Sequence, residues 1–196
     1  MQDLILKAIS PNIERAVAAV ASERAGRPNA SNRELAERIL KGTSWRLGST
    51  GFISGLPSNP AYAVSAGVLE SLNTTNEQMQ LAARIALIYD PSFFESDSAV
   101  EELLVPILGA AKVGGLLRGA AIKASGTITR RLIRDNLKGA ALKQFKKLLL
   151  KYLGLKITQR ALITKTIPVV GGFIGGAWNF GQTRTIGFRV IDFMEV

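Results

Sequence analysis

Helix start signals are the feature that most constrains the fold of this chain. Residues 31–34 (SNRE) and 98–101 (SAVE) both have the form of a capping box, in which the serine caps free amide groups and the glutamate reaches back to the serine amide. No long run alternates apolar and polar residues, and no Asn-Gly or Asp-Gly turn stands between two such runs. The sequence therefore predicts an all-α fold, a compact multi-helix bundle with a long glycine-rich C-terminal helix.

The same signals divide the chain into segments of one domain, residues 1–196, in which residues 1–30 could form an N-terminal helical extension. Helical patterns are expected over residues 3–25, 31–47, 60–89, 98–136, 139–153, 155–164 and 167–194. Residues 48–59 are rich in glycine, serine and proline, which predicts a loop. Further irregularities are expected at Ser10-Pro11, over residues 73–76, near Pro106 and at Gly114-Gly115.

Positive charge is concentrated in one part of the chain, which carries a net charge of +10 at pH 7. Residues 1–111 hold 9 Lys/Arg and 12 Asp/Glu, whereas residues 112–165 hold 14 Lys/Arg and one acid, Asp135. We call residues 112–165 the basic block. A bias of this size favours an anionic partner, either an acidic membrane surface or nucleic acid.

Two clusters within the basic block are the candidate anion and lipid contacts. They are Arg130, Arg131, Arg134 and Lys138, and then Lys143, Lys146, Lys147 and Lys151. The second cluster lies on an amphipathic segment whose apolar positions include Phe145 and Leu149, a pattern that suits a helix lying on a membrane surface. A solvated polar face with its leucines toward the core is the simpler alternative. Nucleic acid is the less favoured partner, because the only aromatics of the block, Phe145 and Tyr152, lie near the apolar face.

Composition argues against most catalytic and metal chemistry. The chain has no histidine and no cysteine, which removes Ser-His-Asp and Cys-His sites, zinc fingers and disulfides. No Walker sequence, dinucleotide-binding fingerprint or EF-hand loop occurs either. We therefore expect a protein that is not an enzyme, with no cofactor and no metal. Without a secretory signal or an unbroken apolar stretch, a cytoplasmic location is expected, with association at the inner face of the membrane.

Paired glycines mark the start of the last expected helix. Gly171 and Gly175, and likewise Gly172 and Gly176, are four residues apart and so share a helix face. Small residues at this spacing let a neighbouring backbone approach closely. Tight packing inside the bundle is the favoured interpretation, and entry of this helix into a bilayer is the alternative.

Three motifs resemble the EcsC family. The most specific is residues 167–179 (IPVVGGFIGGAWN), followed by Thr183-Arg184 and Gly187; the others are residues 48–57 (GSTGFISGLP) and 85–90 (IALIYD). The chain departs from the family pattern in lacking a glycine between Tyr89 and Asp90 and in having a shorter first glycine-rich loop. The resemblance extends from about residue 43 to the C-terminus. It implies an all-helical bacterial protein, encoded in some members beside an ABC transporter, and it carries over no catalytic residue.

Three functions follow as hypotheses. The leading one is a peripheral membrane protein whose basic helical surface contacts anionic lipid. The second is a protein-interaction module, the partner of a transporter or of another protein. The third is a membrane-disrupting effector or toxin, in which residues 105–124 and 167–180 insert as hairpins and release dye from vesicles.

Overall fold

The computed structural model describes residues 5, 7, 9–54, 60–122, 130–165 and 171–196. This part of the chain is helical and contains no strand, so the predicted all-α class is confirmed. Its elements are α2 (Ile13–Gly26), α3 (Asn32–Ser54), α4 (Pro60–Tyr89), the 3-10 helix η1 (Phe93–Glu95), α5 (Ala99–Leu108), α6 (Ala110–Gly119), α7 (Arg130–Asn136), α8 (Gly139–Lys165) and α9 (Gly171–Glu195).

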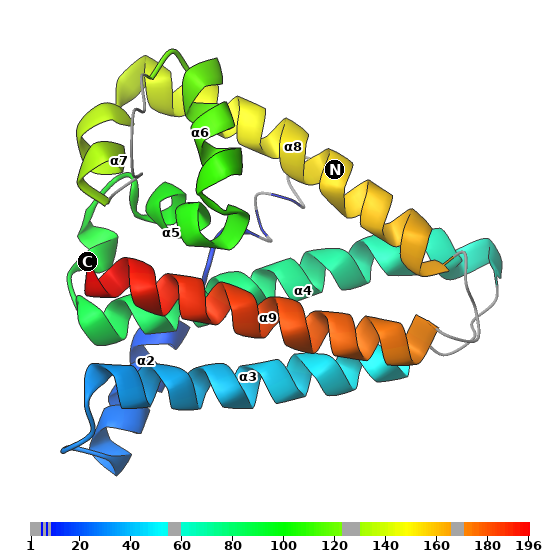
Figure 1. Ribbon diagram of the computed structural model, residues 1–196, viewed down its shortest axis with the longest axis horizontal. Helices are drawn as coiled ribbons and strands as arrows, with labels where there is room; N and C mark the ends of the chain where they lie inside the picture. Colours follow the sequence, from blue (N-terminus) through cyan, green and yellow to red (C-terminus); the bar gives the residue numbers. More distant parts are fainter. Residues whose placement is uncertain (1–4, 6, 8, 55–59, 123–129, 166–170) are drawn as a thin grey trace.

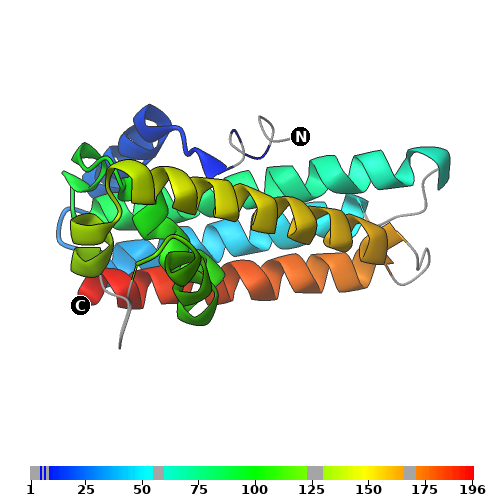
Figure 2. The ribbon, with the colours of Figure 1, turned by 90° about the horizontal axis from the view of Figure 1, so that it is seen from above.

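Three long helices form the base of the molecule. The axes of α3, α4 and α9 have a similar orientation in Figure 1. The chain runs through α9 in the opposite direction to α3, and these two helices make the most extensive contact. Helix α8 lies over this layer, packed mainly on α4 and α6 (Figure 2). Helix α4 also contacts α2, α3, α5 and α9, which makes it the central helix of the bundle.

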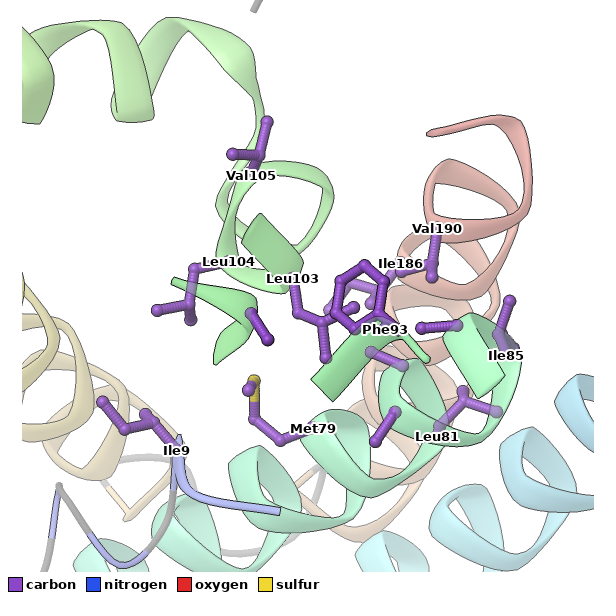
Figure 3. Close-up of a cluster of buried hydrophobic side chains, with 14 of the residues drawn as sticks. Ile9, Met79, Leu81, Ile85, Phe93, Leu103, Leu104, Val105, Ile186 and Val190 are labelled. Carbon is purple, nitrogen blue, oxygen red and sulfur yellow. The ribbon is translucent and has the colours of Figure 1, made fainter. Parts of the chain in front are cut away.

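The densest part of the core lies where α4, η1, α5 and α9 meet. Figure 3 shows Phe93 of η1 in one cluster with Leu103 of α5 and Ile186 of α9, and all three side chains are buried. Met79 and Ile85 of α4 belong to the same cluster. Burying a side chain of this size contributes about 1.5–3 kcal/mol, so these contacts fix the short elements η1 and α5 on the long helices.

Helix α3 is longer than the sequence predicts. It continues to Ser54, so the loop expected from residue 48 is wrong for residues 48–54, and residues 55–59 lie outside the described part. Packing on α9 explains the extension, because a Cβ atom at Gly48 would lie 3.2 Å from Cβ of Phe180. The Ser49 and Thr50 hydroxyls donate to backbone carbonyls one turn earlier, at 3.0 and 3.1 Å, and so remain satisfied within a helix.

Three further boundaries differ from the expectations. Helix α4 is continuous over residues 73–76, and α8 is one helix where two were expected. No break occurs at Gly114-Gly115. The break expected near Pro106 does occur, because α5 ends at Leu108 and the chain turns at Gly109, whose φ of +86° is a conformation that favours glycine.

Only one of the two capping boxes forms. The Ser31 amide donates to Oε2 of Glu34 at 2.7 Å and the Glu34 amide donates to Oγ of Ser31 at 3.2 Å, which confirms the first. The second is wrong, because Ser98 makes no capping bond and its hydroxyl donates to Oε1 of Glu102. The expected partner, Glu101, is buried and turned toward α8 instead.

Candidate functional site

An exposed row of lysines runs along α8. Lys143, Lys147 and Lys151 are spaced by four residues, so they share a helix face, and we call them the basic ridge. All three are exposed, and none forms an ion pair with any residue in the described ranges. Leu155 continues the row and is 58% exposed. The opposite face of α8 holds the buried Phe145 and contributes to the core.

Lys146 has a different role from its neighbours. Its Nζ atom lies 3.2 Å from Oε1 of Glu101, a side chain that is only 4% exposed. The second carboxylate oxygen of Glu101 is buried and has no hydrogen-bond partner among the described residues. Lys146 therefore neutralises a buried carboxylate at the contact between α5 and α8. Of the four candidates on α8, it is the one committed to an internal contact.

The first predicted cluster lies on α7 and in the connection to α8. Arg131 and Lys138 are exposed, and Nε of Arg131 lies 3.6 Å from Oδ2 of Asp135 in an exposed pair that contributes little to stability. Arg130 and Arg134 also belong to α7, but their side chains lie outside the described part. Helix α7 and the start of α8 are at the same end of the molecule (Figure 1).

Of the predicted packing glycines, Gly176 has a described environment. It is buried, and its carbonyl oxygen lies 3.5 Å from the position of a Cβ atom at Gly48 of α3. Gly171, Gly172 and Gly175 lie in α9, but their surroundings are outside the described part.

A cleft of about 660 Å³ lies between α2, α3 and α4. The basic residues that line it are Arg38, Lys41, Arg46 and Arg84, and the carboxylate that lines it is Glu23. Trp45 forms part of its wall and is 61% exposed. The cleft is therefore a basic concavity with an indole ring in its wall, and we call it the arginine cleft.

Two carboxylates near the arginine cleft are already paired. Glu23 lies 3.3 Å from Nε of Arg38 and 3.8 Å from a terminal nitrogen of Arg27. Glu77 accepts a 2.5 Å hydrogen bond from Arg46, which lowers the pKa of Glu77 and raises that of Arg46.

Arg84 differs from the other cations of the cleft. Its side chain is half-buried, and its Nε atom is buried without a hydrogen-bond partner in the described part of the chain. Burial lowers the pKa of Arg84, the positive charges of Arg15 and Arg46 lower it further, and Glu77 partly opposes them. Arg84 is thus a partly desolvated cation beside two like charges.

A second, smaller depression of about 390 Å³ lies between α3 and α9. Phe180 and Phe188 line it, and the guanidinium carbon of Arg184 lies 5.5 Å from the centroid of the Phe188 ring. The rings of Trp45 and Phe180 are 5.0 Å apart, so an aromatic contact joins this depression to the arginine cleft. Trp178 of α9 is 61% exposed.

The sequence predicted the basic ridge but missed the arginine cleft. The cleft residues lie in the half of the chain whose net charge is negative, and Arg84 is 38 positions from Arg46, on another helix. The one available signal was the spacing of Arg38, Lys41 and Trp45, which places them on one face of a predicted helix.

The described residues contain no group of three acidic residues that could hold a metal ion. Within the same ranges, no helix has both the length and the apolar character that crossing a membrane requires. No family model, no curated protein and no solved structure matches the chain. The resemblance to the EcsC family therefore stays a prediction that rests on three sequence motifs.

Proposed function

We propose that this protein binds peripherally to anionic membrane surfaces through the basic ridge on α8, from the cytoplasmic side and without catalysis. The observation that carries the proposal is the exposure of Lys143, Lys147 and Lys151 in one row, with no ion pair to a described residue. The exposed Leu155 at the end of the row offers an apolar contact for the lipid interface. Arg131 of α7 and Lys138, just before α8, are two further exposed cations.

The expected strength follows from the number of free lysines. A Lys or Arg near an anionic membrane surface contributes about 1 kcal/mol, so the three lysines of the ridge contribute about 3 kcal/mol. That corresponds to roughly a hundredfold in the partition constant. The attraction is screened at high ionic strength, because the Debye length falls to about 3 Å at 1 M salt.

Vesicle flotation tests the proposal. Wild-type protein should float with vesicles of phosphatidylcholine and phosphatidylserine at low salt, and should not float with phosphatidylcholine alone. The triple variant K143Q/K147Q/K151Q should lose roughly a hundredfold in partition. A charge-matched control, R27Q/R33Q/R189Q, removes three exposed cations from other elements and should keep most of the binding. Equal recovery with both vesicle types, at low and high salt, would refute electrostatic docking. Dye release from the same vesicles separates docking from membrane disruption.

A protein-interaction module is the second candidate, favoured by the aromatic surface on α3 and α9. Trp45 and Trp178 are each 61% exposed, and exposed tryptophans are enriched where proteins bind partners. A partner captured by wild type without lipid should be lost in W178A and retained in L69A, since Leu69 is a comparably exposed apolar residue on α4. Loss in both variants, or in neither, would remove this candidate.

A further inference from the structure

We infer that the arginine cleft between α2, α3 and α4 binds a small phosphate monoester that carries a planar ring, with Arg84 holding the phosphate and Trp45 stacking on the ring. This site is independent of the proposed membrane surface, because the basic ridge lies on α8 and the cleft is formed by other helices.

The charges of the cleft call for an anion. Its carboxylate, Glu23, is paired with Arg38, and the nearby Glu77 is paired with Arg46. Arg84 and Lys41 make no ion pair within the described residues, although Arg84 is half-buried and the like charges of Arg15 and Arg46 act on it, partly opposed by Glu77. Holding a desolvated cation beside like charges is unfavourable, and an anion entering the cleft would relieve it.

Phosphate fits these donors better than other anions do. A guanidinium group presents a planar fork that matches two phosphate oxygens, and a lysine adds a compact point charge. The cleft offers one such fork without an ion pair to a described residue, Arg84, together with Lys41, while Arg46 is already paired with Glu77. Because a phosphate monoester carries close to two negative charges near neutral pH, it balances this set more completely than a carboxylate does.

The wall of the cleft indicates what the phosphate is attached to. Trp45 lines the cleft with a ring that is 61% exposed, and Phe180 contacts that ring at 5.0 Å with the planes tilted by 56°. An indole held from one side in this way is a platform on which a planar ring can stack. A volume of about 660 Å³ lies within the range of small-molecule sites and suits a nucleoside monophosphate.

Fluorescence titration tests the proposal, because the chain contains two tryptophans. In a W178F background Trp45 is the sole reporter, and adenosine monophosphate should quench its emission in a saturable way. The variant R84M should weaken this binding by at least tenfold. The control R118M, which removes an exposed arginine of α6 outside the cleft, should leave it unchanged. Glycerol 3-phosphate, a ringless monoester that is also the backbone unit of glycerophospholipids, and inorganic phosphate should bind more weakly than adenosine monophosphate.

A melting curve separates a binding role of Arg84 from a structural one. Without ligand, R84M should melt at the same temperature as wild type or higher, because it removes a desolvated cation. Adenosine monophosphate should raise the melting temperature of wild type and not that of R84M.

Equal affinity in R84M and wild type, or no effect of any of the three phosphates at millimolar concentration, would overturn the site. If glycerol 3-phosphate binds as tightly as adenosine monophosphate, the ring is not recognised. Because K143Q/K147Q/K151Q should keep nucleotide binding, failure of one proposal does not imply failure of the other.

Discussion

Replacing Gly187 by alanine should destabilise the contact between α3 and α9. A Cβ atom at this position would overlap Cδ1 of Leu40 and lie 2.8 Å from its Cδ2 and 2.9 Å from its Cγ. Leu40 is 2% exposed and belongs to the core, so its methyl groups cannot move aside without displacing other buried atoms. The whole leucine must shift, or the two helices must separate.

The magnitude depends on two opposing effects. Overpacking a dense core costs about 1–3 kcal/mol, whereas exchanging glycine for alanine inside a helix contributes about 1 kcal/mol of stability. Gly181 in the same helix isolates the second effect, because a Cβ atom there would meet nothing within 4 Å. G181A should therefore stabilise the protein by about 1 kcal/mol, and G187A should fall about 1–3 kcal/mol below it.

Urea denaturation followed by circular dichroism measures both variants against wild type. For a chain of this length the difference between them corresponds to roughly 3–9 °C in melting temperature. A double variant, G187A/L40A, should lose less stability than the sum of the two single changes, because the added methyl group occupies the space that leucine vacates. If G187A is as stable as G181A, the close approach of α3 and α9 at Leu40 is wrong.

Two further predictions concern ionic contacts. K146M should lower the free energy of unfolding by about 1–3 kcal/mol, because it leaves the buried Glu101 without its cation. The control K147M should stay within about 0.5 kcal/mol of wild type. Equal effects of the two variants in urea denaturation would contradict the distinction between these lysines. The hydrogen bond from Arg46 holds the pKa of Glu77 below its ordinary value. The pair therefore stabilises the fold at any pH above the ordinary pKa of a glutamate, and this stabilisation is lost as the pH falls through the lowered pKa. Wild type should therefore exceed E77Q in unfolding free energy at pH 7, and the gap should close in acid; a gap that is constant from pH 7 to pH 3 would count against the pair.

The helical class was predictable because its signals are local. The Ser31 capping box sets the start of α3, and periodic apolar residues such as Leu81, Ile85 and Ile88 mark the buried side of α4. The end of α3 was not predictable, because glycine at residue 48 weakens a helix considered alone. Glycine at residue 48 is favourable only in the folded protein, where Phe180 of α9 packs close to its backbone. The same holds at residue 101, since a glutamate that could cap α5 pairs with Lys146 of a helix far away in the sequence.

The candidate sites differ in the same way. The lysines of the basic ridge are four residues apart in one predicted helix, so the ridge could be predicted from the local sequence alone. The arginine cleft requires three helices to come together, and its net charge depends on which carboxylates are already paired. A count of charges along the chain does not reveal the arginine cleft, because residues 1–111 contain more acidic than basic residues.

The shape of each basic surface determines the partner that it suits. Lysines along an outer helix are solvated individually, and together they match an extended anionic surface on which many headgroups offer charge. The cations of the cleft surround a concavity in which Arg84 is half-buried, and a concavity strengthens the electrostatic field, so they match one compact anion. The two kinds of contact should also respond differently to salt. Screening acts fully on the exposed lysines and much less on a partly buried pair, so added salt should release the protein from vesicles well before it releases a nucleotide from the cleft.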